Sequence, residues 1–159
     1  LALSSNTTKA EFLAKISERL NNWGADHTTL TDLTGLDPKN VSTPRDVLKI
    51  FTKVTSDNSL KKILGKQSYT INATLGTKKI THQVLTTNQL GRTPHTAYNV
   101  LAGKTGYTQE AQANLVMLIE AKDSKKKYII ITMGNPDTDR RFTEPDRLAQ
   151  WIATYKEPK

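Results

Sequence analysis

The chain has 159 residues and a formal net charge of +8. Its lysines are dispersed, and no predicted helix carries a basic stripe interleaved with aromatic residues, so we expect no nucleic-acid partner. We instead expect the charge to attract the chain to an anionic cell-wall or membrane surface. Hydrophobic residues make up 36% of the total, enough for one domain over residues 1–159, and no run approaches the ~18 apolar residues of a membrane-spanning helix. The absence of cysteine excludes disulfide bonds and thiolate metal sites.

The first predicted element is an amphipathic helix. Thr8 and Glu11 have the spacing of a capping box, which predicts a helix that begins near Lys9 and ends at Gly24. Residues 25–41 are rich in Thr, Asp, Gly, Pro and Asn and are predicted to form a loop. The apolar face of the helix recurs at helical spacing: Phe12, Leu13, Ile16, Leu20 and Trp23.

A second helix is predicted after this loop. Thr43 is its expected N-cap, Pro44 occupies the first helical position, and Asp46 is expected to close the cap. Residues 59–64 are predicted to add a short helical turn. The buried stripe of the second helix consists of Val47, Ile50, Phe51 and Val54.

From Ser68 the pattern changes to strands. Residues 69–73 and 79–85 are predicted to pair around a turn at Gly76 and Thr77. A second hairpin, formed by residues 115–121 and 128–133, is expected to turn at Asp123 and Ser124, next to the lysine cluster 125–127. Helices first, then antiparallel strands and a closing helix indicate an α+β layered domain. The closing helix has an apolar stripe, and we expect its Trp151 to join Trp23 and Phe51 in the core.

Between the two hairpins lies an extended stretch, residues 98–108, with the sequence Lys104-Thr105-Gly106 at its centre. Because successive side chains of a strand point to opposite faces, Lys104 and Gly106 should share one face and Thr105 should take the other. A glycine within a strand often marks a place where a ligand or another backbone comes close. Lys-Thr-Gly is also a signature of the serine penicillin-recognising enzymes, alongside Ser-x-x-Lys and a Ser-x-Asn element.

Several further segments extend this similarity in the same order along the chain. Together they run from about Trp23 to Tyr155 and resemble the bacterial D-alanyl-D-alanine carboxypeptidases, the low-molecular-mass penicillin-binding proteins. The resemblance implies a layered α/β/α fold of the serine β-lactamase and transpeptidase type with an antiparallel sheet. The matching segments are residues 34–37, 42–46, 88–90, 103–108 and 114–116, and Met133-Gly134 before Arg141-Phe142.

The sequence departs from this family in its nucleophile. The family carries a Ser-x-x-Lys upstream of all the segments that match here. The two Ser-x-x-Lys matches of this chain, at residues 59–62 and 124–127, lie downstream and in polar surroundings, a predicted surface turn and a hairpin. We therefore expect the chain to be the C-terminal two-thirds of a catalytic domain, incomplete at its N-terminus, and inactive by itself.

A second departure concerns Ser4-Ser5-Asn6, which has the Ser-x-Asn form. A helix that usually follows this motif in the family is missing, and the helix beginning near Lys9 comes almost directly after it. Two interpretations stay open: the intervening helix is deleted, or the three residues are a polar lead-in to the next helix. We favour the motif, because the apolar run before it is typical of that setting.

The resemblance implies a role for each site residue. Lys104 would face the cleft and form a hydrogen bond with Ser4. Ser4 would relay a proton to the leaving amine, and Asn6 would hold the amide of the peptide. Three further residues would bind the substrate. Thr105 would donate to the terminal carboxylate, and Gly106 would let the peptide lie along the strand. The Tyr107 amide would form half of an oxyanion hole.

The implied reaction is acyl transfer by a serine-type D-Ala-D-Ala carboxypeptidase that acts on peptidoglycan stem peptides outside the cytoplasm and is inhibited by β-lactams. The missing N-terminal segment would be its partner. No cofactor is implied. His27, His82 and His95 lack ligand spacing, so we expect no metal site. Arg140 and Arg141 could meet a carboxylate near the site, but we expect a solvated pair in a loop. The alternatives are a non-catalytic peptidoglycan-binding module and a class A β-lactamase.

Overall fold

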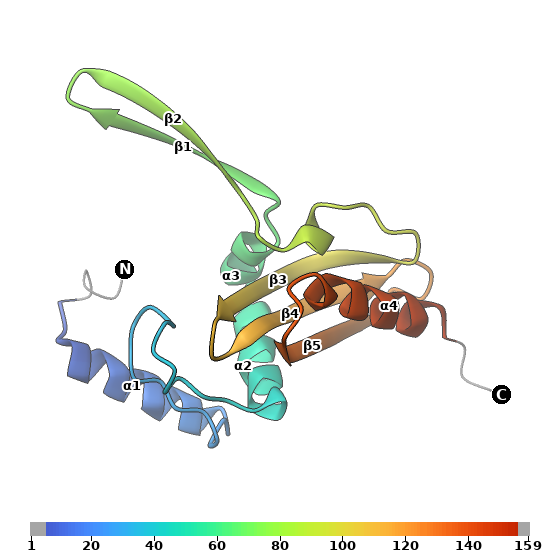
Figure 1. The fold of residues 1–159 in the computed structure, drawn as a ribbon, viewed down its shortest axis with the longest axis horizontal. Helices are drawn as coiled ribbons and strands as arrows, with labels where there is room; N and C mark the ends of the chain where they lie inside the picture. Colours follow the sequence, from blue (N-terminus) through green and yellow to red (C-terminus); the bar gives the residue numbers. More distant parts are fainter. Residues whose placement is uncertain (1–5, 156–159) are drawn as a thin grey trace.

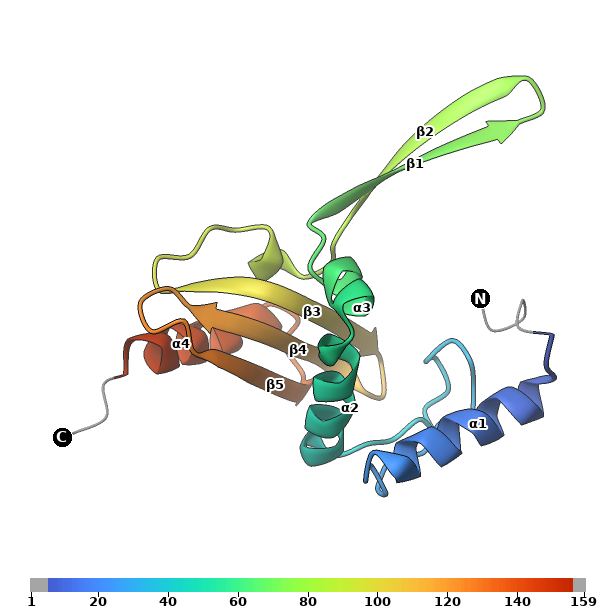
Figure 2. The ribbon, with the colours of Figure 1, turned by 180° about the vertical axis from the view of Figure 1, so that it is seen from behind.

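The computed structural model describes residues 6–155, which form a three-stranded antiparallel sheet between helices. Figure 1 shows α4 (Arg140–Thr154) on one face of the sheet, and Figure 2, from behind, shows α2 (Pro44–Ser56) and α3 (Asn58–Leu64) on the other. Two further parts lie away from the sheet: the N-terminal helix α1 (Lys9–Asn22) and a projecting β-hairpin. The architecture confirms the predicted α+β class.

The sheet consists of β3 (Tyr98–Thr108), β4 (Gln112–Ala121) and β5 (Lys127–Asn135), in that spatial order. Lys104 pairs with Val116 and Thr105 with Leu115, and the register shifts at a bulge between Val100 and Ala102. The central strand is buried at every second residue and provides most of the core with α4. The buried members of β4 are Ala113, Leu115, Met117, Ile119 and Ala121.

The beginning of β3 is tied to α4 by an aromatic and polar cluster. The Tyr98 hydroxyl donates to Asp146 Oδ1 at 2.6 Å, and burial, together with this hydrogen bond, raises the pKa of the Tyr98 phenol. The His95 ring stacks on Tyr98 at a centroid distance of 4.2 Å and places Nδ1 3.3 Å from Asp146 Oδ1. These contacts set the position of the strand that carries Lys-Thr-Gly.

The first helix begins as predicted. The Glu11 amide donates to Thr8 Oγ1 at 3.2 Å and the Thr8 amide donates to Glu11 Oε2 at 2.8 Å, which completes the capping box. The apolar face of α1 does not pack on the sheet: it lines a cavity of about 530 Å³ whose other walls come from the loop of residues 25–41 and the start of α2.

The cap of α2 is partly as predicted. The Asp46 amide donates to Thr43 Oγ1 at 3.2 Å, which confirms the N-cap. The Asp46 carboxylate does not return to the cap, because it is buried and accepts from the His27 amide at 2.7 Å and the Thr28 hydroxyl at 3.2 Å. Asp46 therefore fastens the preceding loop to α2.

The prediction that Trp151 belongs to the core is wrong. Phe51 is buried and Trp23 is half-buried, but Trp151 is 57% exposed. The helix α4 instead presents Phe142 and Ala149 to the sheet, so Trp151 lies on the opposite side and packs against Tyr155 at a centroid distance of 5.2 Å.

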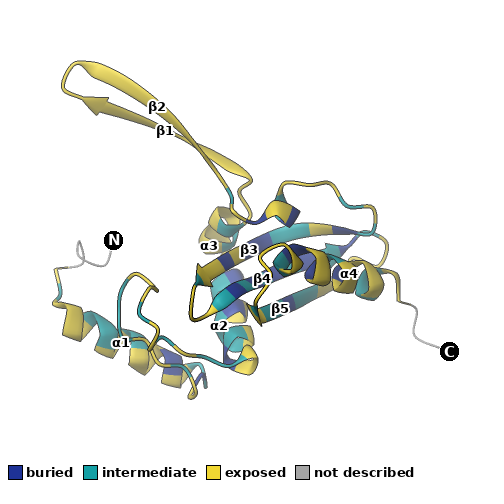
Figure 3. Cartoon of the chain, viewed as in Figure 1, coloured by how far each residue is buried: buried dark blue, intermediate teal, exposed yellow. Residues whose placement is uncertain are grey.

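The projecting hairpin consists of β1 (Ser68–Leu75) and β2 (Lys78–Leu85), paired around Gly76 and Thr77 as predicted. Every residue of both strands is exposed, and Figure 3 shows the hairpin without any buried segment. A short 3-10 turn, η2 (Gln89–Gly91), leads from it towards β3. Within residues 6–155, no helix combines the length and the apolar character that crossing a membrane requires.

Candidate functional site

A cavity of about 650 Å³ opens where the end of α3, the base of the hairpin and the middle of β3 meet. Its walls include Lys104 and Thr105 from β3 and Thr87 from the segment after the hairpin. Apolar side chains of α3 and the hairpin, such as Ile63 and Tyr69, form the opposite side. The structure therefore brings two of the predicted site residues to one concave surface, which is the usual form of a ligand site.

Lys104 is exposed, and its Nζ donates to the carbonyl oxygen of Thr105 at 2.5 Å. Gly106 is exposed as well, whereas Thr105 between them is buried, so the alternation predicted for this strand is confirmed. Lys104 therefore presents its ammonium on the exposed face of the strand and lines the cavity.

Thr105 is only 8% exposed, and its hydroxyl lies 2.5 Å from the hydroxyl of Thr87. This hydrogen bond holds the Thr105 oxygen at the cavity wall, and one of the two hydroxyl protons stays free to donate elsewhere. Sequence reasoning did not single out Thr87. It lies 18 residues before Thr105, in a segment without periodicity, and only the fold brings the two together.

Asn88 packs against the same strand at Gly103. Its side chain is buried, and a Cβ added to Gly103 would lie 2.5 Å from Asn88 Nδ2. A side chain at position 103 would therefore force the Asn88 side chain to move. Asn88 Oδ1 is buried and has no hydrogen-bond partner in the described part of the chain, so this polar atom is available to a further group.

The far end of the strand is more open. Tyr107 is exposed, and a Cβ added to Gly106 would meet only Asn114 Cβ, at 3.9 Å. No part of the described chain thus requires glycine at position 106. A glycine that its own fold does not require is consistent with the close approach of another molecule.

Arg141 reaches this end of the strand from the beginning of α4. Its Nη1 donates to the Gly106 carbonyl at 3.3 Å, and its guanidinium carbon lies 4.8 Å from the centre of the Phe142 ring. Its Nε is buried and has no hydrogen-bond partner within residues 6–155. Arg140 is solvated as predicted, with an exposed ion pair to Asp137 at 3.6 Å, but it begins α4 instead of lying in a loop. Arg141 is half-buried beside Lys-Thr-Gly. The motif Arg-Phe was visible in the sequence, yet its position next to Gly106 was not.

Most of the predicted Ser-x-Asn motif lies outside residues 6–155. Ser4 lies outside the described residues. Asn6 is exposed, has a positive φ of 52° and is not among the residues that line the cavity. The roles of both residues stay predictions.

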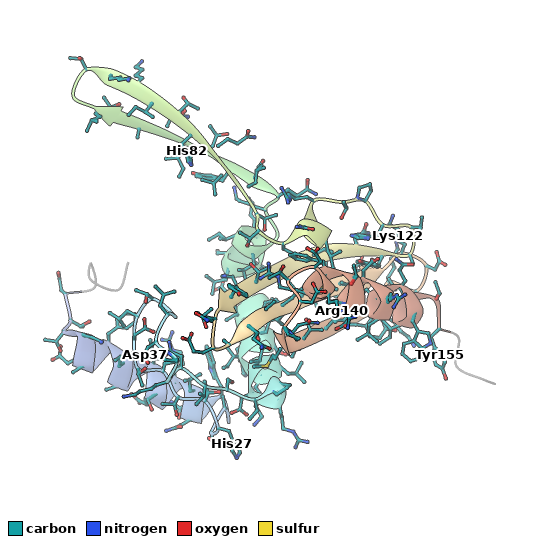
Figure 4. All side chains as sticks on the ribbon, in the orientation of Figure 1. His27, Asp37, His82, Lys122, Arg140 and Tyr155 are labelled. Atoms are coloured by element: carbon teal, nitrogen blue, oxygen red, sulfur yellow. The ribbon has the colours of Figure 1, made fainter. Side chains whose placement is uncertain are left out.

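The two internal Ser-x-x-Lys matches do not line the cavity. Ser59 and Lys62 are exposed residues of α3, which confirms the short helical turn predicted for residues 59–64 at the surface. Ser124 is exposed in the turn between β4 and β5, as predicted. Figure 4 shows His27 beside the loop after α1 and His82 on the hairpin, on different parts of the molecule.

The sequence profile of a family described as D-alanyl-D-alanine carboxypeptidase matches residues 1–137. A D-alanyl-D-alanine endopeptidase of Haemophilus influenzae is 25% identical over 141 residues, which are 89% of this chain and 46% of that protein. The crystal structure of D-alanyl-D-alanine carboxypeptidase from Mycobacterium tuberculosis has a TM-score of 0.70 and 23% identity, and the match covers 89% of this chain and 51% of that one.

A further match is the Streptomyces K15 DD-transpeptidase, with a TM-score of 0.77 and 23% identity over 94% of this chain and 57% of that chain. These likenesses confirm the transpeptidase-like fold expected from the sequence. The chain spans about half the length of these relatives.

Proposed function

The chain belongs to the D-alanyl-D-alanine carboxypeptidase family, and on this premise we propose that it forms the substrate-binding half of a serine-type D-Ala-D-Ala carboxypeptidase. The observation that carries the proposal is the pairing of an exposed Lys104 with a buried Thr105 on the wall of one cavity. The substrate is a peptidoglycan stem peptide ending in D-Ala-D-Ala, and the place of action is outside the cytoplasm.

The edge of β3 binds the peptide backbone. β3 pairs with β4 on one side and is the outer strand of the described sheet, so an extended peptide can add to its other edge through main-chain hydrogen bonds. Gly106 leaves space for this approach because its Cβ position is open. The peptide therefore lies across Lys104, Thr105 and Gly106.

Three groups receive the negative charge of the substrate. The Thr105 hydroxyl, held by Thr87, donates to the terminal carboxylate. Arg141, beside the Gly106 carbonyl, adds a cationic donor at the same end of the strand, and the Lys104 ammonium adds positive charge on the exposed face. Charge-assisted hydrogen bonds of this kind are shorter and stronger than neutral ones, which favours a peptide with a free carboxylate.

The nucleophile is a serine supplied by a segment outside these 159 residues. A serine hydroxyl attacks a peptide bond only when a neighbouring base takes its proton, and neither Ser59 nor Ser124 lies on the cavity wall. Ser68 does line the cavity, but the residue three positions after it is Ile71 and not lysine, so it is not part of a Ser-x-x-Lys motif. Ser4 and Asn6 complete the proton relay and the amide contact, and the Tyr107 amide helps to hold the oxyanion. The serine displaces D-Ala, and water then hydrolyses the acyl-enzyme. β-Lactams acylate the same serine.

The test is a substitution at Lys104 in the protein that includes the Ser-x-x-Lys segment. Lys104→Ala should lower the rate of acylation by about two orders of magnitude, since one charged contact to the reacting groups is worth ~3 kcal/mol. The readout is D-Ala release from a peptide ending in D-Ala-D-Ala. Lys62→Ala and Lys127→Ala, exposed lysines elsewhere on the chain, should change the rate by less than about twofold.

A folded Lys104→Ala protein that acylates at the normal rate contradicts the assignment of Lys-Thr-Gly. A wild-type protein that binds stem peptides without releasing D-Ala indicates the non-catalytic binding module instead. The family match favours the carboxypeptidase over the class A β-lactamase.

A further inference from the structure

The hairpin of β1 and β2 extends away from the sheet into solvent (Figures 1 and 2). Residues at its base line the cavity. Each strand has eight residues, which corresponds to a length of about 26 Å. All sixteen strand residues are exposed (Figure 3). Because a two-stranded ribbon is marginally stable in water by itself, a surface that covers one of its faces would stabilise it.

The two faces of the hairpin differ in chemistry. The pairing of Ala73 with Ile80 and of Leu75 with Lys78 places the odd-numbered residues of β1 and the even-numbered residues of β2 on one face. The opposite face is polar except for Leu85 at the base of the hairpin, and on it Thr81 Oγ1 donates to Asn72 Oδ1 at 3.0 Å. The apolar face contains Tyr69, Ile71, Ala73, Leu75, Ile80 and Val84, and His82 and Lys78 complete it.

The apolar character reaches the tip of the hairpin. Leu75, the last residue of β1, is 73% exposed, which makes it the most exposed of the large hydrophobic residues described. Lys78 and Lys79 follow directly after the turn. An exposed apolar tip with adjacent cations is the combination that interfacial membrane-binding elements use.

The charge around the hairpin is of one sign. From Asn58 to Gln109 the sequence has no aspartate or glutamate. A partner of this region must therefore be anionic if it is to gain from electrostatic attraction. The region carries seven basic residues: Lys61, Lys62, Lys66, Lys78, Lys79, Arg92 and Lys104.

We propose that the tip of the β1–β2 hairpin docks on an anionic lipid surface, with Leu75 and Ile80 entering the headgroup region and Lys78 and Lys79 contacting the negative headgroups. A second copy of the chain fits less well, because two such hairpins would bring like charges together without any acidic residue to offset them. Docking by the tip would leave the cavity at the base of the hairpin about 26 Å from the membrane surface.

The test uses the 159-residue chain and sedimentation with lipid vesicles. The wild-type chain should sediment with vesicles of phosphatidylcholine and phosphatidylglycerol at 3:1 and stay in solution with phosphatidylcholine alone. The double substitution Lys78→Glu/Lys79→Glu should weaken binding at least about tenfold, and Leu75→Ser/Ile80→Ser, which keeps the charge, should weaken it about fivefold or more. Leu75→Trp should show a blue-shifted fluorescence on binding.

The matched control is Lys125→Glu/Lys126→Glu in the exposed turn between β4 and β5. It changes the net charge by the same amount and should bind within about twofold of the wild type. Equal losses in both charge variants would show that net charge alone drives binding and would overturn the proposal. So would a wild-type chain that binds neither vesicle, or hairpin variants that bind like the wild type. Self-association without lipid that Leu75→Ser/Ile80→Ser abolishes would assign the apolar face to a second copy.

Discussion

Position 65 shows how one missing side chain lets a helix meet the strand of the site. Gly65 caps α3, and a Cβ added there would lie 2.4 Å from the carbonyl oxygen of Leu101. Leu101 lies at the bulge of β3, three residues before Lys104. The backbone of β3 is thus in direct contact with the end of α3, and this contact sets one wall of the cavity.

We expect Gly65→Ala to destabilise the chain by about 1–3 kcal/mol, because the new methyl group forces a backbone carbonyl or the helix end to move. The free energy of unfolding in urea measures the effect. Gly106→Ala is the matched control in the same strand region, since its Cβ has only one neighbour, at 3.9 Å. Equal stabilities of the two variants would mean that Gly65 of α3 is not in close contact with the Leu101 carbonyl of β3.

Asp46 acts at the scale of elements, since its carboxylate joins the loop of residues 25–41 to α2. Burial raises the pKa of this carboxyl, but the His27 amide, the Thr28 hydroxyl and the Lys49 ammonium outweigh it, so the pKa lies below its usual value. In the same loop, Asp32 accepts hydrogen bonds from Thr34 and Asn40, which hold its pKa far below the usual range. Two carboxylates therefore organise a loop that has little apolar content.

These lowered pKa values predict a loss of stability in acid. A carboxyl whose pKa is lower in the folded state stabilises the protein above its unfolded value, about 3.9, and loses this contribution as the pH falls through the folded pKa. Asp46→Asn should lower the free energy of unfolding at pH 7 and reduce its decrease between pH 5 and pH 2. Urea unfolding across this range gives the measurement.

The exposed Asp123→Asn serves as the control for the loss of one negative charge, and it should keep the wild-type stability at pH 7. If Asp46→Asn were as stable as the wild type at pH 7, the loop would be held by other contacts.

At the scale of the whole molecule, the described chain has a binding surface on β3, but the serines of its two Ser-x-x-Lys matches, Ser59 and Ser124, do not line the cavity. The relatives it matches are about twice as long. We therefore expect the 159-residue chain to form no covalent adduct with a fluorescent penicillin, because acylation needs an activated serine at the cavity. Gel fluorescence and intact mass provide the readout, and a chain that includes the Ser-x-x-Lys segment is the positive control. Labelling at Ser59 or Ser124 would contradict the proposal that the nucleophilic serine comes from a segment outside these 159 residues.

Much of this architecture follows from local patterns in the sequence. Capping residues Thr8 and Thr43, the turn at Gly76, and the alternation of Lys104 and Thr105 all depend on neighbours within a few positions, so their outcome could be predicted. Trp151 could not, because which side of an amphipathic helix faces the sheet is decided by the packing of the whole layer.

The sequence by itself determined the α+β class, the strand carrying Lys-Thr-Gly and the family resemblance, since these depend on periodicity and on motifs in order. Only the tertiary structure decided that Thr87 and Arg141 meet that strand, and that Asp46 is buried under the loop instead of closing its helix cap. The reason is physical. These contacts join residues 18 to 35 positions apart, and no local propensity encodes a distance in space that depends on how separate elements pack.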